Sequence, residues 1–390
     1  MKPEQDINFD LGLPIVDLPQ TNNCIIKVIG VGGGGGNAVN HMYREGIHDV
    51  SYVVCNTDKK ALDDSAVPNH LQLGNDGLGA GNRPEKARQA AEQSMDAIKE
   101  MLNDGTRMVF ITAGMGGGTG TGAAPIIARC AKEAGILTVG IVTIPFRFEG
   151  IKKINQALVG VEEISKHVDA LLVINNERLR KIYPELTVIN AFAKADDTLT
   201  IAAKSIAEII TMHGIMNLDF EDVTTVLKDG GVAIMSTGYG EGENRVTKAL
   251  NEALTSPLLN HNDIFNSKKV LLNINFCADN EQDSLMMEEM NEIHEFMAKF
   301  QNEVETKWGL ATDSTLGSKV KITLLATGFG LQGISETEYY DDSEDNPGHR
   351  HRNIFIYSAD NIDDEDIISR VDASPTWKRT KEEIKDWKSK

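Results

Sequence analysis

The sequence predicts an α/β fold in two parts. The first is a doubly wound parallel sheet that binds a nucleotide, and a long central helix joins it to a second domain with a mixed sheet. Two glycine clusters indicate the first part, because each follows a strand-like apolar run and leads into a helix-like segment. A continuous helical pattern over residues 188–213 indicates the central helix. After residue 220, helical and strand patterns no longer alternate regularly, which favours a mixed sheet.

Composition sets the class of protein before any motif does. The chain has 390 residues, of which 41% are hydrophobic and 25% charged, so it is long enough for two globular domains with tails. Its net charge of −19 argues against a surface for nucleic acid or anionic lipid. The four cysteines stand singly without zinc-site spacing, and we expect a cytoplasmic protein with reduced thiols. No apolar run approaches the length of a membrane span, so direct membrane insertion is not expected.

The first glycine cluster, Gly32–Gly36, follows the apolar run 25–31, and the second, Gly116–Gly122, follows the run 107–113. Glycine lets backbone N–H groups approach an anion closely, and a helix N-terminus adds roughly half a positive charge. Ligands of open parallel sheets bind at the carboxyl ends of the strands, where both clusters lie. The two clusters together therefore predict a polyphosphate site.

The elements between residues 25 and 186 alternate in the order that a parallel sheet requires. Further strands are expected at 50–55, 136–143 and 169–174, and helices at 36–45, 84–102, 123–134 and 152–167. In the second domain we expect helices at 245–254 and 285–301 and strands at 232–236, 270–276 and 320–327. The predicted organisation is an extension (1–23), a nucleotide-binding domain (24–187), the central helix (188–213), a second domain (214–332) and an acidic-then-basic, disordered tail (333–390).

Three kinds of nucleotide site compete for the glycine clusters. A P-loop needs a lysine that reaches the phosphates, and neither cluster contains one. A dinucleotide site needs GxGxxG and an acid after the second strand. Residues 30–35 match only because they are mostly glycine, and Asp58 could be the acid. That second interpretation leaves Gly116–Gly122 unexplained.

The motif GGGTGTG at Gly116–Gly122 resembles the signature of the tubulin/FtsZ GTPase family, and the similarity extends from about residue 25 to 331. Five further segments resemble the family in the right order. They are 56–58 (NTD), 77–81 (GLGAG), 145–150 (PFRFEG), 216–223 (MNLDFEDV) and 256–259 (SPLL). The resemblance implies a tubulin-like fold, GTP or GDP as ligand with Mg²⁺, and hydrolysis of GTP.

The resemblance also implies which residues contact the phosphates and the ribose. The first glycine cluster and Asn37 would hold the nucleotide, although a flexible linker is the plainer interpretation. Gly118, Thr119 and Gly120 would bind the β- and γ-phosphates, or serve only close packing. The turn 80–83 would lie near the γ-phosphate, where Arg83 departs from the family and is expected to be solvated. Glu149 would bind ribose, and Lys153 stands where the family commonly has arginine. The nucleotide-binding residues expected up to this point are Gly33, Gly34, Gly35, Gly36, Asn37, Asp58, Ala80, Gly81, Gly118, Thr119, Gly120, Glu149 and Lys153.

The guanine base would lie near the start of the central helix by the same resemblance. Phe192 would stack on the base, and either Asp196 or Asp197 would accept hydrogen bonds from guanine. The sequence alone does not decide which of the two aspartates faces the base. Asn176 could also face guanine. The plainer interpretations are a core phenylalanine and a turn-forming asparagine.

Asn217, Asp219 and Asp222 are the expected catalytic residues. Asp219 can also be explained as the N-cap of a helix that begins at Phe220, with Asp222 in its first turn. If the base lies near Phe192, these acids are roughly 30 Å away along the central helix and cannot act on their own nucleotide. A second copy stacked head to tail would bring them over its neighbour's γ-phosphate, and such a contact produces filaments.

The expected function is therefore a filament-forming GTPase at the mid-cell division ring, with itself as partner. Membrane-tether proteins and regulators would bind the tail, and Pro375–Arg379 is the expected binding segment. A plasmid-partitioning or cell-shape relative is the alternative within the family. A NAD-dependent oxidoreductase and a non-hydrolysing nucleotide-gated scaffold are the alternatives from other classes.

Overall fold

The computed structural model describes residues 24–47, 49–211, 214–255, 264–280, 283–300 and 304–329. The chain divides into two compact units, Met1–Ser335 and Glu336–Lys390, and all described residues belong to the first. The predicted extension at 1–23 and the whole of the predicted tail at 333–390, with Pro375–Arg379, lie outside the described residues. Both predicted globular domains fall within the first unit.

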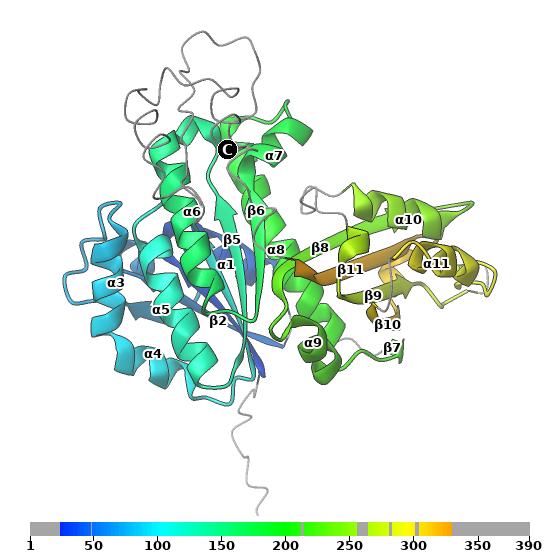
Figure 1. The fold of residues 1–390 in the computed structure, drawn as a ribbon, viewed down its shortest axis with the longest axis horizontal. Coiled ribbons are helices and arrows are strands. Elements are labelled where there is room, and N and C mark those ends of the chain that lie inside the picture. The colour runs from blue at the N-terminus through cyan, green and yellow to red at the C-terminus, as the bar shows by residue number, and fades with distance from the viewer. Residues whose placement is uncertain are drawn as a thin grey trace, which may run out of the picture. The chain divides into compact units, whose positions relative to one another are not determined.

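One sheet runs through this unit, and its eleven strands fall into a parallel and a mixed part (Figure 1). All pairings among β3, β2, β1, β4, β5 and β6 are parallel, as predicted. Strand β8 joins β6 through two residue pairs only, Ala170 with Gly231 and Leu171 with Val232. Beyond it, β8, β11, β9, β10 and β7 pair in mixed directions. In spatial order the strands are β3 (His70–Gln72), β2 (Val50–Asn56), β1 (Ile26–Val31), β4 (Met108–Gly114), β5 (Leu137–Ile144), β6 (Ala170–Asn175), β8 (Gly231–Gly240), β11 (Val320–Phe329), β9 (Lys269–Phe276), β10 (Glu305–Thr312) and β7 (Gly214–Met216).

Helices cover both faces of the parallel part, which is the doubly wound arrangement that the sequence predicts (Figure 1). Helices α1 and α8 pack on one face, and α5 and α6 pack on the other with α3 and α4 outside α5. The helices are α1 (Gly32–Glu45), α2 (Lys59–Asp63), α3 (Pro84–Gln93), α4 (Met95–Leu102), α5 (Thr119–Glu133), α6 (Ile151–Ser165), α7 (Asn176–Ile182), α8 (Val188–Thr211), α9 (Phe220–Leu227), α10 (Arg245–Leu254) and α11 (Met290–Met297), with short 3₁₀ turns at Arg147–Glu149, Ile264–Asn266 and Ser314–Leu316.

Helix α8 is the predicted central helix, and its described part spans Val188–Thr211. One apolar cluster contains Leu199 and Ile206 of α8 together with Met235 of β8 and Leu271 of β9. The same cluster includes buried residues of β1, β4 and β6. The helix therefore connects the cores of both parts of the sheet.

Two predicted helices differ from the structure for identifiable reasons. The segment 84–102 is divided at Ser94 into α3 and α4, and the Ser94 hydroxyl accepts a hydrogen bond from the Gly74 backbone. The segment 285–301 is helical only over Met290–Met297. Just before this segment, the guanidinium of the buried Arg245 donates hydrogen bonds to the carbonyls of Asp283 and Ser284. It also forms an ion pair with Glu289 at the start of α11.

Candidate functional site

The two glycine clusters lie side by side at the carboxyl ends of β1 and β4, which are neighbouring parallel strands. A Cβ built on Gly32, whose φ is +74°, would lie 2.8 Å from the Gly120 nitrogen. One built on Gly34 would lie 3.2 Å from the Gly114 Cα. Backbone therefore packs directly on backbone here, which only glycine permits. Helix α1 begins inside the first cluster, four residues earlier than predicted, because this packing offsets the low helix propensity of glycine.

The N-termini of α1 and α5 are both open. Neither N-cap residue, Val31 or Gly118, makes a side-chain capping hydrogen bond, and neither first turn contains an acidic residue. Gly33 and Gly34 are exposed, and a Cβ on Gly33 or Gly117 would meet no protein atom within 4 Å. The first N–H groups of a helix have no partner within the helix, so two open helix ends fit a polyphosphate.

The turn at residues 80–83 lies against the second glycine cluster. A Cβ on Gly118 would lie 2.8 Å from the Ala80 Cβ and 3.1 Å from the Arg83 nitrogen. Gly81 has a φ of +58° and faces open space. The side chain of Arg83 is exposed, and the residue precedes α3 as its N-cap. The structure thus brings the predicted γ-phosphate turn to the second cluster.

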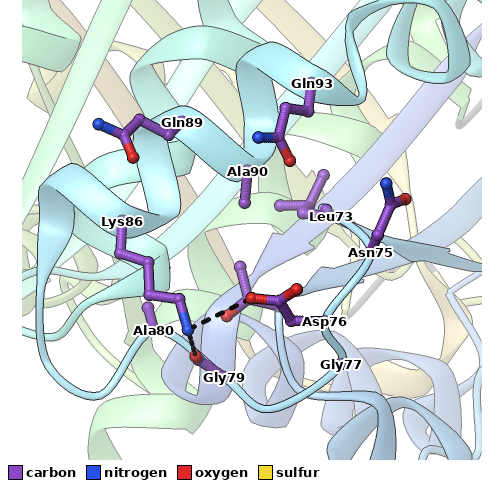
Figure 2. A pocket seen from close by; sticks show the side chains of 12 residues that line it. Leu73, Asn75, Asp76, Gly77, Gly79, Ala80, Lys86, Gln89, Ala90 and Gln93 are labelled. Atoms are coloured by element: carbon purple, nitrogen blue, oxygen red, sulfur yellow. Dashed lines mark hydrogen bonds and ion pairs between the residues drawn. The ribbon is translucent and has the colours of Figure 1, made fainter.

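Next to this turn lies an open pocket, lined by residues of α3 and of the segment 73–80 (Figure 2). Lys86 of α3 donates to the Gly79 carbonyl at 3.4 Å and lies 3.7 Å from the Asp76 carboxylate. The pocket also includes Thr57 and Ala80, so it adjoins the glycine clusters without containing them. These contacts join α3 to the segment that carries Ala80.

Three residues that the sequence did not identify shape the second glycine cluster. The Gln156 side chain of α6 donates to the carbonyls of Gly116 and Gly117 at 3.1 and 2.9 Å. The Thr121 hydroxyl accepts from the Gly116 nitrogen at 2.9 Å. The hydroxyl of Thr57, at the end of β2, lies 2.7 Å from that of Thr119. Thr57 and Thr121 stand within the motifs at 56–58 and 116–122, but their contacts, like those of Gln156, are visible only in the folded chain.

The residues predicted to bind ribose form a paired group. Glu149 accepts from the Phe146 nitrogen at 3.0 Å and from the Lys153 ammonium at 3.1 Å. Asp58 has a different local role, because its carboxylate caps α2 by accepting from the Lys60 and Ala61 nitrogens. Glu149 therefore lies at the start of α6, oriented by its neighbours.

Asn176 begins α7 and is almost fully buried at 5% exposure. Among the described residues its side-chain oxygen has no hydrogen-bond partner. The neighbouring Glu177 is also buried, and its carboxylate accepts from the Arg147 nitrogen and pairs with Arg180. Because buried polar atoms are usually paired, the Asn176 oxygen is an acceptor available to a ligand.

Phe192 lies in an aromatic group with Phe146 and Phe148, at ring distances of 5.2 and 6.1 Å. It is 41% exposed, so it is not an ordinary core residue. Four residues along α8, Asp196 shares its helix face, and burial raises the pKa of the Asp196 carboxyl to about 6. Asp197 is instead paired with His41 of α1 at 2.8 Å.

The predicted catalytic acids lie past the other end of α8, at the start of α9. Asp219 and Asp222 form a reciprocal capping box, in which each carboxylate accepts from the other's nitrogen at 2.9 and 3.2 Å. The capping role proposed from the sequence is confirmed. Lys307 of β10 lies 2.9 Å from the second Asp222 oxygen and lowers the pKa of that carboxyl. The Asn217 side chain accepts from the Gly214 nitrogen.

The residues that the structure describes contain no group of three or more histidine, cysteine, aspartate or glutamate side chains arranged to hold a metal ion. Within the same residues, no helix combines the length and the apolar character needed to cross a bilayer.

Comparison with protein-family models gives three matches along the chain. Residues 25–184 match the GTPase domain of the Tubulin/FtsZ family, and residues 231–330 match the C-terminal domain of the FtsZ family. Residues 349–390 match a model described as FtsZ, C-terminal, which extends the similarity into the predicted tail.

Curated relatives agree with these models. The chain is 60% identical to the cell division protein FtsZ of Porphyromonas gingivalis over 338 residues, which cover 85% of this chain and 71% of the relative. It is 45% identical to the FtsZ of Buchnera aphidicola (subspecies Schizaphis graminum), over 81% of this chain and 82% of that one.

Solved structures share the fold. An empty FtsZ dimer from M. jannaschii is 37% identical with a TM-score of 0.70, covering 78% of this chain and 88% of that one. CetZ2 from Haloferax volcanii has a TM-score of 0.66 at 18% identity, over 78% and 92% of the two chains, and supports the fold alone. The chain therefore belongs to the tubulin/FtsZ family and is a GTPase with the two-domain, tubulin-like fold.

Proposed function

We propose that GTP binds with its phosphates at the paired N-termini of α1 and α5 and its base at the start of α8. The single observation that carries this placement is that two adjacent helix ends have neither a capping side chain nor an acidic residue. The phosphates would receive backbone N–H groups of Gly33–Gly36 and of Gly118, Thr119 and Gly120. Ala80 and Gly81 would border the γ-phosphate, while Asn37, Glu149 and Lys153 would contact the nucleoside. Mg²⁺ would enter with GTP as part of the substrate, since it binds nucleotide phosphates while keeping several waters.

We assign guanine recognition to Asp196 rather than Asp197. Asp196 shares a helix face with the exposed Phe192, whereas one carboxylate oxygen of Asp197 is already paired with His41. The Asp196 carboxylate loses solvation in the free protein, which raises its pKa. Guanine N1–H and the 2-amino group would supply the missing donors. The unpaired oxygen of Asn176, at the start of α7, which packs on α8, would be a further acceptor.

We propose that hydrolysis is completed by a second copy of the chain. Between Asp196 and Thr211 the helix rises roughly 22 Å, and Asp219 and Asp222 follow beyond its end (Figure 1). These acids therefore do not reach the nucleotide of their own subunit. A head-to-tail contact would place the start of α9 against the open helix ends of the next copy. The dimer described for the M. jannaschii relative supports association of this fold with itself.

In such a contact Asp219 and Asp222 would orient a water toward the γ-phosphate and accept its proton, with Asn217 beside them. Phosphoryl transfer requires mainly positioning and charge neutralisation, which the helix N–H groups and the Mg²⁺ that accompanies GTP would supply. A head-to-tail contact does not close on itself, so it would form a filament. We propose that this filament builds the mid-cell division ring and that tether proteins bind the tail at Pro375–Arg379.

The test is phosphate release from GTP measured against protein concentration, with filaments quantified by sedimentation. A trans-completed site predicts a rate per subunit that is near zero at high dilution and rises above a threshold concentration. Filaments and phosphate release should appear at the same threshold. A rate per subunit that is independent of concentration would show that hydrolysis occurs within one subunit and would contradict the proposal.

A further inference from the structure

We propose that Lys307 is a positioning residue for GTP hydrolysis, which holds the Asp222 carboxylate in the orientation that the reaction needs. The inference rests on the proposed trans-acting role of Asp222. Lys307 lies on β10, far from the segment 217–222 in sequence and outside every motif that suggested the function. The residue becomes relevant only through the fold.

The geometry of the Asp222 side chain carries this inference. One carboxylate oxygen accepts from the Asp219 nitrogen at 3.2 Å, within the capping box. The other accepts from the Lys307 ammonium at 2.9 Å. Both oxygens are therefore fixed by separate elements, the start of α9 and strand β10. The carboxylate keeps 26% of its surface exposed, so it is held in place without being covered.

Strand β10 brings Lys307 to this position because Gly309 lies two residues along the same strand face. A Cβ on Gly309 would lie 2.8 Å from the Leu218 side chain and 3.0 Å from the Met216 carbonyl. The missing side chain lets the segment 216–219 lie directly on β10. The ammonium of Lys307, on the same face, then meets the carboxylate of Asp222.

The charged neighbours leave Lys307 as the cation on Asp222. Arg107, which precedes β4, pairs with Glu221 at 2.8 Å and lies over the Phe220 ring. Lys269 of β9 donates to the Thr225 carbonyl. Asp222 raises the pKa of the Lys307 ammonium, and Glu305 on the same strand and Asp219 raise it further. Among the described residues, the ion pairs at the start of α9 thus assign Arg107 to Glu221 and Lys307 to Asp222.

A purely structural ion pair would make a different prediction. Partly exposed ion pairs contribute little to stability because solvent screens them, so loss of this one should hardly affect folding. The chain offers a matched control in Lys321 of β11, which pairs with Glu208 of α8 at the same 2.9 Å distance. That pair also joins a strand lysine to a helical carboxylate, but it lies away from the capping box.

The experiment compares Lys307→Met, Lys307→Arg and Lys321→Met in the full chain. Phosphate release is divided by the amount of sedimented filament, and thermal unfolding checks the fold. We expect Lys307→Met to lower turnover per polymerised subunit about tenfold, since small misplacements of reacting groups have effects of this order. Lys307→Arg should restore most of the rate, and Lys321→Met should keep it. The filament threshold should stay the same in all three.

A double variant tests whether Lys307 acts through Asp222. In an Asp222→Ala background, Lys307→Met should lower the residual rate no further, because the group that it positions is gone. Unchanged or faster turnover in Lys307→Met, or equal losses in Lys307→Met and Lys321→Met, would overturn the inference. If Asp222→Ala alone keeps full turnover, the proposed role of Asp222 fails instead, so the two failures are distinguishable.

Discussion

The N-termini of α1 and α5 differ from the N-terminus of α9 in whether the chain itself supplies a negative charge there. The first two begin with glycine-rich turns, have no capping side chain and contain no acid in their first turns. Helix α9 is capped by Asp219 and has Glu221 and Asp222 in its first turn. Every helix N-terminus favours an anion. At α9 the chain supplies that anion itself, whereas at α1 and α5 it leaves the place open.

This difference divides binding from hydrolysis within one chain. The open N-termini of α1 and α5 can receive phosphates. The N-terminus of α9, the filled end, carries carboxylates that can accept a proton. Helix α8 spans the distance between them, so under the proposed function each region needs the complementary region of another copy. Predictions that alter one region at a time test this division.

The largest effect is expected from Asp222→Ala, which removes a proton acceptor from the filled end. Phosphate release per filament should fall by about 10²–10⁴, the usual contribution of such a group. Binding of GTP, measured with a fluorescent analogue, should not change. Glu221→Gln is the matched control, because it removes an acid from the same helical turn that pairs with Arg107 rather than Lys307. Equal losses in both variants would contradict a specific role for Asp222.

The next largest effect is expected from Gly33→Glu, which gives the open end of α1 its own carboxylate. Gly33 is exposed and a Cβ there meets nothing, so the fold should tolerate it. A carboxylate at this place should stabilise the helix by about 0.3–1 kcal/mol and repel the phosphates. Isothermal calorimetry should show at least about a hundredfold weaker GTP binding, while the melting temperature stays equal or rises.

Gly33→Ala serves as its control, because it adds bulk without charge at the same position. GTP binding should weaken much less than in Gly33→Glu. If both variants bind GTP as the unaltered chain does, the phosphates lie elsewhere and the comparison of helix ends fails.

A smaller effect is expected from Asp196→Ala, which removes the proposed acceptor for guanine. The preference for GTP over ITP, which lacks the 2-amino group, should fall by about 10- to 100-fold, as an unpaired hydrogen-bonding group costs roughly 1–3 kcal/mol. Competition binding with the two nucleotides measures it. Asp197→Ala should lower the preference less, because Asp197 is paired with His41. The opposite order would assign guanine to Asp197.

The smallest effect is a pH dependence of stability in the nucleotide-free protein. Burial raises the pKa of Asp196 to about 6 in the folded chain, above its ordinary value of 3.8. The folded state therefore binds this proton more tightly, and the resulting stabilisation is present below about pH 4 and lost as pH rises through 6. Asp196→Asn should raise the melting temperature at pH 8 relative to the unaltered chain, with a smaller increase at pH 4.5, where part of the stabilisation is still present. No difference at pH 8 would contradict the burial of a charged Asp196.

Much of the fold and of the site can be predicted from local patterns. The parallel strands are short and apolar, a helix begins within each glycine cluster, and Asp219 marks the start of α9 as its N-cap. These features are encoded within a few residues, so they are visible without tertiary contacts. The residues of the family motifs likewise stand in order along the chain, and the structure brings both glycine clusters and the turn 80–83 together.

What the sequence did not reveal depends on contacts between distant segments. Strand β10 is exposed or half-buried over its first four residues, and it contains Lys307 and Gly309, which no local pattern singles out. Gln156 acts on carbonyls of the second glycine cluster from another helix. The choice between Asp196 and Asp197 depended on the position of His41 on α1. Such partners are chosen by the packing of elements, not by neighbours in the sequence.

The central claim, that two copies share each active site, is tested most directly by mixing two inactive variants. Asp222→Ala keeps the open helix ends and lacks the acid, whereas Gly33→Glu keeps the acid and lacks the phosphate site. Each alone should release little phosphate. In the mixture, GTP on the first variant can meet the acids of the second, so the rate should exceed the sum of the separate rates. A rate equal to that sum, with both variants folded and associated, would contradict a site completed in trans.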